Sequence, residues 1–296
     1  MSTRSLLAVF AHPDDESFAI GGTLAKYAAA GGEVSLAVAT RGEAGRGGGD
    51  PVLKGMAREQ ELRRAARLLG VRHLRVLGLW DGHVARADRS LLVSRFVGIL
   101  RELRPQVVIT FGPDGISGHP DHVAIGEATT EAFGLAGRAA YTVGPGGEDL
   151  KPHHPLRLFY VAPSPATREC CRKGEGMSPA NGLTAVDIGA FRETKVRAMQ
   201  SHESQDQPFP GDPELEASRL HAQEYFRLAW PARTDPPAAD LFEGLPREKR
   251  DCPSAEGIGG TNPPRDGEGR DCGFEWRRRH TDQGDGEGAH GAPTTR

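Results

Sequence analysis

Two short segments of this chain combine histidine with carboxylates, the side chains that bind divalent metal ions. Residues 12–16 read HPDDE (the HPDDE segment) and residues 119–122 read HPDH (the HPDH segment). Each follows an apolar run, residues 6–10 and 107–111, that is typical of a buried strand. Imidazole and carboxylate suit Zn²⁺ and similar ions, and three protein ligands plus water form a catalytic arrangement. The two segments therefore predict a metal-dependent hydrolase.

The spacing inside the HPDDE segment predicts separate roles. His12 and Asp15 are three residues apart, so both side chains can face one side of a first helical turn. We expect His122 to be the third ligand, which leaves a position for a water molecule whose pKa the metal lowers to about 7. Asp14 lies beside these ligands and is predicted to be the general base. The alternative is that the acids only favour a helix N-terminus, which does not account for the histidines.

The HPDH segment has the composition of a helix start. Pro120 suits the first helical position, which makes His119 the N-cap residue and places His122 in the first turn. His119 would then face substrate, where its protonated ring could stabilise an oxyanion or donate a proton to the leaving amine. Asp121 is expected to orient and charge His119, a pairing that requires an irregular turn because residues two apart do not face each other on a helix.

Apolar patterns along the chain predict the elements that carry these segments. Strands are expected at residues 6–10, 34–40, 74–79, 107–111 and 156–162, and helices at 20–30, 56–69, 91–103, 122–135, 186–199 and 213–228. This order predicts an α/β protein with a Rossmann-like, doubly wound, mostly parallel sheet in three αβα layers. In strand order 3-2-1-4-5, the first and fourth strands are neighbours at the switch point, so the two segments should meet at the crevice.

Composition excludes some partners and locations. The net charge of −3 gives no basic footprint, so we expect no nucleic-acid partner. No apolar stretch approaches the roughly 20 residues that a membrane span needs. The four cysteines show no metal-clip spacing and fit a reducing compartment, which predicts a cytoplasmic protein. A homo-oligomer is compatible with the sequence but not predicted by it.

The composition also changes toward the C-terminus. From about residue 236, glycine, proline and charged residues dominate and aliphatic runs vanish. A segment of this composition has little apolar surface to bury. We therefore expect one domain over residues 1–235 and a disordered tail over residues 236–296.

Taken together and in this order, the two segments resemble the motifs of the PIG-L/LmbE-like deacetylase family, over roughly residues 6–205. Members are zinc-dependent and remove the N-acetyl group from N-acetylglucosamine conjugates of phosphatidylinositol, myo-inositol, malate or chitooligosaccharides. The resemblance implies that His12, Asp15 and His122 bind Zn²⁺, with Fe²⁺ as the alternative ion. It makes Asp14 the base and His119 the acid or oxyanion-stabilising group. Asp121 would tune His119, as the spacing also suggests.

Other residues gain roles from the resemblance alone. Arg41 in the TRGEAG stretch and Asp81 in the LWDG stretch would contact sugar hydroxyls, the alternative being ordinary surface-loop polarity. His202 belongs to a C-terminal signature and would shape or close the site. Some members carry a tyrosine two or three residues before the first histidine of the HPDH motif, and those positions are Ile116 and Ser117 here. Oxyanion binding would therefore fall to His119 and the metal, or to a donor from another loop.

The sequence thus predicts a zinc-dependent N-deacetylase acting on a small amino-sugar conjugate. The stretch GEAGRGGGDPV, residues 42–52, resembles thiol-cofactor pathway members, which suggests a bacillithiol-like intermediate as substrate. A nucleotide-binding oxidoreductase would carry G-x-G-x-x-G after its first strand, and this chain does not. A phosphotransferase with an aspartyl nucleophile would not need the histidines. A metal-binding or regulatory module of the same fold without catalytic activity remains the alternative that an activity assay would decide.

Overall fold

The structure, a computed structural model, describes residues 2–46, 48–144, 147, 149–164, 182–205, 208–231, 239–246 and 248–249. Its centre is a seven-stranded sheet of order β4-β3-β2-β5-β6-β8-β7. The strands are β2 Ser5–Phe10, β3 Glu33–Thr40, β4 His73–Leu79, β5 Val107–Thr110, β6 Arg157–Ala162, β7 Leu183–Asp187 and β8 Gln223–Trp230. The first five are parallel, and β8 is antiparallel to both β6 and β7. The predicted strand order 3-2-1-4-5 is therefore confirmed.

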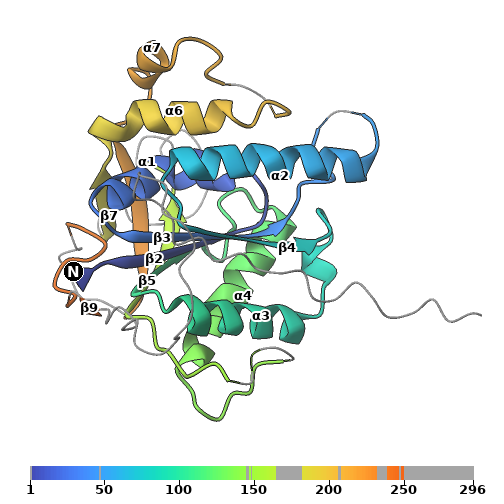
Figure 1. The fold of residues 1–296 in the computed structure, drawn as a ribbon, viewed down its shortest axis with the longest axis vertical. Coiled ribbons are helices and arrows are strands. Elements are labelled where there is room, and N and C mark those ends of the chain that lie inside the picture. The colour runs from blue at the N-terminus through green and yellow to red at the C-terminus, as the bar shows by residue number, and fades with distance from the viewer. Residues whose placement is uncertain are drawn as a thin grey trace, which may run out of the picture. The chain divides into compact units, whose positions relative to one another are not determined.

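Helices cover both faces of this sheet. They are α1 Asp15–Ala29, α2 Pro51–Leu68, α3 Arg89–Leu103, α4 Pro120–Ala136, α6 Arg192–Gln200 and α7 Pro213–Ala217, with 3-10 turns at Val84–Arg86 and Gly189–Phe191. Figure 1 shows α1, α2 and α6 on one face and α3 and α4 on the other. A short antiparallel pair, β1 Ser2–Thr3 and β9 Glu248–Lys249, forms a second, two-stranded sheet. The predicted α/β class is confirmed. No helix in the described part of the chain is long and apolar enough to cross a membrane.

The central strands are apolar because both of their faces are covered. Every residue of β2, β3 and β5 is buried. Such strands read as continuous hydrophobic runs, which is why the sequence predicts them well. Their parallel register also aligns their carboxyl ends, since Leu6 pairs with Val107 and Ala8 with Ile109. The segments that follow β2 and β5 therefore leave the sheet side by side.

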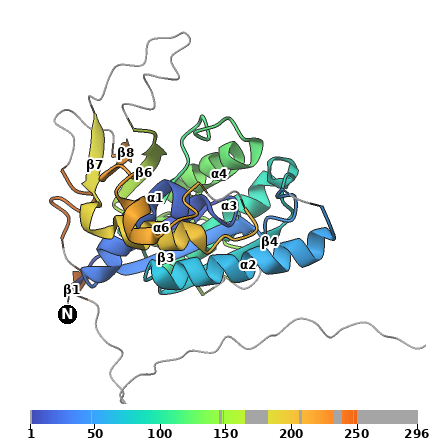
Figure 2. The same ribbon diagram turned by 90° about the horizontal axis from the view of Figure 1, so that it is seen from above.

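The C-terminal part of the sheet differs from the sequence prediction. The helix expected at residues 186–199 begins only at Arg192, because the chain first completes β7 and then makes a 3-10 turn. The helix expected at residues 213–228 ends at Ala217, and its second half is strand β8. Glu224 and Phe226 are buried on one face of β8, a period of two that the helical spacing concealed. Figure 2 shows β6, β7 and β8 together at one end of the sheet.

The domain extends past the predicted boundary at residue 235. Leu241 and Phe242 are buried, and the Leu241 N–H donates to the hydroxyl of Tyr27 at 3.3 Å. The Phe242 ring packs edge-on against Tyr27, with ring centroids 5.0 Å apart. Arg157 also donates to the Leu241 carbonyl at 2.9 Å. Residues 239–246 thus belong to the folded unit, whereas residues 236–238, 247 and 250–296 of the expected tail lie outside the described residues.

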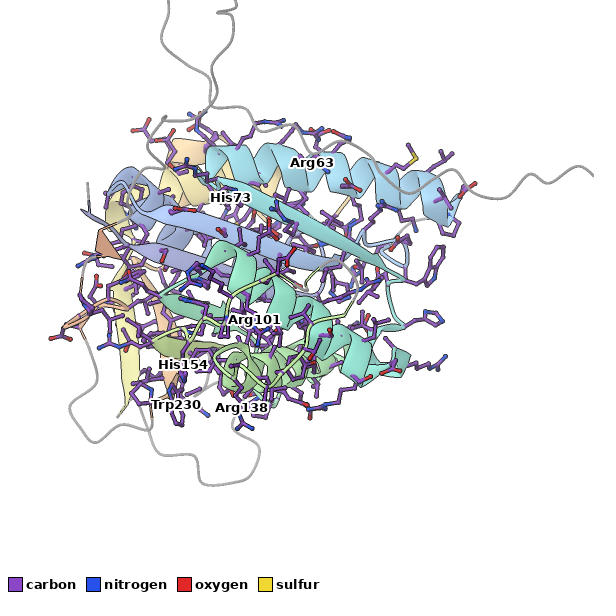
Figure 3. The ribbon with its side chains drawn as sticks, turned by 60° about the horizontal axis from the view of Figure 1, so that its bottom comes forward. Arg63, His73, Arg101, Arg138, His154 and Trp230 are labelled. Atoms are coloured by element: carbon purple, nitrogen blue, oxygen red, sulfur yellow. The ribbon has the colours of Figure 1, made fainter. Side chains whose placement is uncertain are left out.

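A buried arginine fixes the helix that carries the HPDH segment. Arg101 of α3 donates to the carbonyls of Ala136 at 3.0 Å and Arg138 at 2.7 Å, at the C-terminal end of α4 (Figure 3). A cation at this end satisfies carbonyls that the helix leaves without partners. At Gly126, α4 lies so close to the residue after β5 that an added Cβ would be 2.6 Å from the Phe111 carbonyl oxygen. These contacts place the first turn of α4 at the carboxyl end of β5.

Candidate active site

The structure brings the HPDDE and HPDH segments together at the carboxyl ends of β2 and β5. The HPDDE segment leads into α1, and the HPDH segment begins α4 with His119 as the N-cap and Pro120 in the first turn. The His122 ring stacks on Phe111, with ring centroids 4.1 Å apart and planes 4° from parallel. The predicted convergence is therefore present: His12 Nδ1 lies 3.1 Å from His122 Nε2, across 110 residues of sequence.

Hydrogen bonds determine which nitrogen of each ring carries a proton. His12 Nε2 lies 3.0 Å from Asp81 Oδ1 and 3.4 Å from Asp121 Oδ2. Ionised carboxylates only accept, so Nε2 is the donor. His122 Nδ1 lies 3.2 Å from the Gly115 carbonyl oxygen and must donate there. In their neutral forms, the two rings thus turn the lone pairs of His12 Nδ1 and His122 Nε2 toward each other.

Asp15 completes this group. Its Oδ1 lies 3.3 Å from His122 Nε2, and its Oδ2 lies 3.6 Å from His12 Nδ1. The backbone N–H groups of Ala11 and His12 donate to Oδ2 at 3.2 and 2.8 Å and fix the carboxylate. Burial raises the pKa of Asp15, but hydrogen bonds and charges from the two histidines bring it well below its usual range. Asp15 is therefore an anion beside two imidazole nitrogens.

This donor set fits a divalent metal ion. Facing lone pairs repel each other unless a proton or a cation lies between them, and each ring is oriented by an acceptor on its other nitrogen, as metal-binding histidines usually are. Two nitrogens and one carboxylate oxygen match a catalytic zinc site. Two other groups among the described residues could also hold an ion: His12, His119 and His122, or His12, Asp81 and Asp121. Both contain His12.

Metal binding at this site should release a proton. Burial lowers the pKa of His12, but the carboxylates of Asp121, Asp15 and Asp81 raise it to about 12. The metal-free protein therefore holds an imidazolium at His12, and a metal at Nδ1 displaces about one proton. The calorimetric heat of Zn²⁺ binding at about pH 8 should differ between two buffers in proportion to their ionisation enthalpies. Equal heats would show that His12 is already neutral.

Asp14 stands next to this group and outside the set of expected ligands. Burial raises the pKa of Asp14, the charge of Asp15 raises it further, and nearby Arg58 lowers it, for a value of about 7. Arg58 Nη2 donates to Asp14 Oδ2 at 3.1 Å. The backbone of Asp14 has φ 108°, a conformation that residues other than glycine rarely adopt. A carboxylate with a pKa near neutrality suits proton transfer.

His119 and Asp121 interact differently from the prediction. The Asp121 carboxylate accepts the Gly82 N–H at 2.7 Å and faces His12, instead of bonding to the His119 ring. What joins the two residues is the Asp121 backbone N–H, which donates to His119 Nδ1 at 3.2 Å. Residues two apart at a helix start diverge, so the expected carboxylate–imidazole hydrogen bond does not form. The charge of Asp121 raises the pKa of His119, but burial, then the nearby His12 and His122, hold it below its usual value. His119 is therefore a neutral ring with its proton on Nε2, from which it can donate.

These side chains line a cleft of about 570 Å³. Its walls are His12, Asp14, Asp15, Phe18, Ala44, Gly45, Arg46, Arg58, Asp81, Gly82, His119, His122, Gln205 and Pro208. Asp81 lines the cleft, and its carboxylate is engaged by His12 and by the Ala44 N–H at 3.0 Å, so its contact with a sugar hydroxyl stays a prediction. Arg41 is not among the lining residues; it is half exposed and pairs with Glu59 at 2.7 Å.

The buried arginine of the cleft is Arg58, which the sequence analysis missed. It is almost fully buried, and it donates to the carbonyls of Gly42 at 2.9 Å and Pro13 at 2.7 Å as well as to Asp14. The glycines of the TRGEAG stretch allow this, because a Cβ on Gly42 or Gly45 would collide with the guanidinium. Those two glycines were the signal in the sequence that a buried group approaches this loop.

Replacing the two arginines should separate their roles. Arg58→Ala leaves two carbonyls and the Asp14 carboxylate without their donor, so we expect a loss of about 3–5 kcal/mol in the free energy of unfolding. Arg41→Ala removes one exposed ion pair and should change it by less than about 0.5 kcal/mol. Urea denaturation of both variants measures the difference. Equal effects would contradict the assignment of Arg58 as a buried clamp.

Beneath the HPDDE segment lies a fully buried polar group formed by Glu16, Ser17 and His202. His202 Nε2 is 2.9 Å from Glu16 Oε1, and the Ser17 hydroxyl donates to the same oxygen at 2.6 Å. Burial lowers the pKa of His202, but the charge and hydrogen bond of Glu16 raise it above its usual value. His202 thus lies close to the site and contacts Glu16 of the HPDDE segment, but it does not line the cleft.

Comparisons with known proteins agree on one family. Residues 7–133, which contain both segments, match the PIG-L family model, GlcNAc-PI de-N-acetylase. The 1D-myo-inositol 2-acetamido-2-deoxy-alpha-D-glucopyranoside deacetylase of Rhodococcus jostii (strain RHA1) is 32% identical over 296 residues, covering 83% of this chain and 99% of that protein. The structure of the conserved protein TT1542 from Thermus thermophilus is 28% identical, with a TM-score of 0.59 and coverage of 79% and 98%. That of N,N'-diacetylchitobiose deacetylase from Pyrococcus horikoshii is 22% identical, with a TM-score of 0.58 and coverage of 75% and 82%.

Proposed function

The chain belongs to the PIG-L family and is an N-deacetylase, and from this premise we propose that it hydrolyses the N-acetyl group of an N-acetylglucosamine conjugate with the help of Zn²⁺. The observation that carries the proposal is the convergence of His12, His122 and Asp15, with Asp14 beside them in the cleft. A catalytically inactive metal-binding module, the alternative left by the sequence, would not need a further carboxylate with a pKa near neutrality at this place.

We assign the metal to His12 Nδ1, His122 Nε2 and the Asp15 carboxylate. Asp81 and Asp121 accept from the other nitrogen of His12 and so hold its ring in the required tautomer. The ion, when bound there, supplies a Lewis acid and a water molecule of lowered pKa. Fe²⁺ accepts the same donor set, so the metal itself is part of the proposal.

The remaining cleft residues perform the proton transfers. Asp14 accepts the proton of the attacking water, because it lies beside the proposed ligands without being one of them, and burial raises its pKa in the metal-free protein. The same carboxyl group can return that proton to the leaving amine nitrogen when the C–N bond breaks. His119 donates from Nε2–H to the oxygen of the amide carbonyl as negative charge develops on it. Among the described residues that line the cleft there is no tyrosine, so the oxyanion donor is assigned to His119.

The conjugate that we favour is N-acetylglucosamine joined to inositol, because the Rhodococcus relative is named for that substrate and aligns with 83% of this chain. The cleft of about 570 Å³ has the size of an ordinary small-molecule site. A malate conjugate, the bacillithiol-like intermediate suggested by residues 42–52, is the second candidate. Loops vary most between related enzymes, so aglycone selection is expected in residues 139–185 and in the glycine-rich loop of residues 42–50. Of these, residues 47, 145, 146, 148 and 165–181 lie outside the described part.

The proposal extends to the setting of the enzyme. We propose that it works in the cytoplasm, because its four cysteines show no metal-clip spacing and fit a reducing compartment. We propose that its partner is a small, soluble amino-sugar conjugate and not a nucleic acid, because a net charge of −3 gives no basic footprint. Residues 251–296 are proposed to be an extension outside the catalytic domain, because glycine, proline and charged residues dominate their composition. A homo-oligomer remains compatible with the proposal and is not required by it.

Acetate release tests the function. Chelated protein and Zn²⁺-reconstituted protein are compared on N-acetylglucosamine alone and on its inositol, malate and chitobiose forms. We expect release only with metal, fastest from the inositol conjugate. Equal rates on all four substrates would remove the aglycone assignment, and stoichiometric metal binding without any acetate release would remove the proposed substrate class.

A further inference from the structure

The buried group of Glu16, Ser17 and His202 lies directly against the backbone of Asp14. We propose that Glu16 and His202 are positioning residues that hold Asp14 in its positive-φ backbone conformation, and thereby aim its carboxylate into the cleft. The inference rests on the proposed function, in which Asp14 is the general base. It assigns no contact with substrate or metal to either residue.

The conformation of Asp14 requires a restraint. Its φ of 108° is unfavourable for a residue with a Cβ, and such conformations persist only when the surroundings impose them. Here the restraint acts on both sides of the residue. The Asp14 N–H donates to Glu16 Oε2 at 3.1 Å, and the Asp14 carbonyl accepts the N–H groups of Ser17 and Phe18, each at 3.0 Å. The backbone hydrogen bond to Glu16 therefore selects the unusual φ.

Glu16 can impose this geometry because it is itself fixed. Its side chain has no exposed surface, and a buried carboxylate is tolerated only when its oxygens have partners. Oε1 receives the Ser17 hydroxyl at 2.6 Å and His202 Nε2 at 2.9 Å, which leaves Oε2 for the Asp14 N–H. An acid that only favoured a helix N-terminus would face solvent, so the helix-dipole explanation does not fit Glu16.

His202 arrives from a distant part of the chain, 186 residues after Glu16. It follows α6, which packs against α1, and its own N–H donates to the Met199 carbonyl at 3.1 Å. Its carbonyl accepts the N–H of Gln205 at 3.0 Å, and Gln205 lines the cleft. The turn after α6 thus contributes Gln205 to the cleft wall. The same turn carries His202, which holds Glu16 and, through it, the backbone of Asp14.

The inference predicts that His202 affects catalysis only through Asp14. His202→Ala should lower kcat by about 10- to 100-fold with little change in KM, because a displacement of about 1 Å can cost 10²-fold. His202→Gln keeps an Nε2 donor near the same place and should restore most of the rate. His153→Ala is the matched control: His153 is also buried and bonds to the Pro105 carbonyl at 2.8 Å, away from the cleft, so its loss should not lower kcat.

A double-mutant cycle separates positioning from general damage. In an Asp14→Asn background, adding His202→Ala should cause no further loss of kcat, because the group through which His202 acts is gone. A further loss equal to that seen in the wild-type background would overturn the proposal, as would a His202→Gln variant no better than His202→Ala. If His202→Ala does not fold, Ser17→Ala removes the other donor to Glu16 Oε1 and should show a smaller loss of kcat that also vanishes with Asp14→Asn.

A crystal structure gives a readout that needs no substrate. In His202→Ala, or in Ser17→Ala if the first variant does not fold, the Asp14 φ should become negative and its N–H should leave Glu16, while Zn²⁺ stoichiometry stays that of the wild type. An unchanged Asp14 backbone in that variant would overturn the inference even if deacetylation is confirmed. Conversely, a relaxed Asp14 in an enzyme that cleaves no tested conjugate would support the positioning and reject the proposed function.

Discussion

His122→Ala should abolish both tight metal binding and acetate release. His122 Nε2 lies 3.1 Å from His12 Nδ1 and 3.3 Å from Asp15 Oδ1, at the centre of the proposed ligand set. Removing it leaves two protein ligands where a catalytic zinc site has three, so we expect the affinity for Zn²⁺ to fall by more than about 100-fold. Turnover should drop to that of the chelated protein. Metal titration by calorimetry and acetate release measure the two effects.

The matched control is His73→Ala. His73 lies at the amino end of β4, whereas the cleft lies at the carboxyl ends of the strands, and it pairs with Glu33 at 3.1 Å. Its metal content and kcat should equal those of the wild type.

His119→Ala and Asp15→Ala then distinguish the ligand sets. We expect Asp15→Ala to lose the metal and His119→Ala to keep it with a reduced kcat. The reverse pattern would move the site to the group of His12, His119 and His122.

The sequence was sufficient for the half of the fold that builds the site. Buried parallel strands such as β2 and β5 are continuous apolar runs, and the neighbourhood of the two segments follows from strand order alone. The C-terminal strands were missed because β8 is half-buried and antiparallel, and its pairing with β6 and β7 depends on residues far away in the chain. Local apolar spacing does not contain that information.

The same limit separates the site residues that were foreseen from those that were not. His12, Asp15 and His122 are few, chemically specific and placed at strand ends, so residue type and spacing identify them. Arg58 lies within a helix rich in arginine, and only the packing of α2 against the loop after β3 shows that it, and not Arg41, enters the cleft. The direction of the Asp121 carboxylate likewise depends on the Gly82 N–H, which belongs to another loop.

Asp14→Asn should bind Zn²⁺ as the wild type does and lose most of its turnover. The amide cannot accept the proton of the attacking water, and general-base catalysis is worth about 10²- to 10⁴-fold. Asparagine tolerates positive φ better than most residues, so the backbone held by Glu16 should be preserved. Acetate release at saturating substrate measures kcat, and metal content is determined on the same sample. A variant with wild-type kcat would show that another group is the base.

Asp14→Asn should also raise the free energy of unfolding of the metal-free protein, but only above about pH 4. The pKa of Asp14 is raised from 3.8 to about 7, chiefly by burial and by Asp15. Below pH 3.8 the Asp14 carboxyl group is protonated in both the folded and the unfolded chain, so it does not lower the free energy of unfolding. Between the two values the unfolded chain loses its proton first, and stability therefore falls as pH rises, until the folded protein also ionises near 7. Urea denaturation in chelator should show Asp14→Asn gaining stability over the wild type from about pH 4 to pH 7 and a constant gain above that. An advantage independent of pH would mean that burial does not penalise the ionised carboxylate, and the assignment of Asp14 as a base with a raised pKa would then fail.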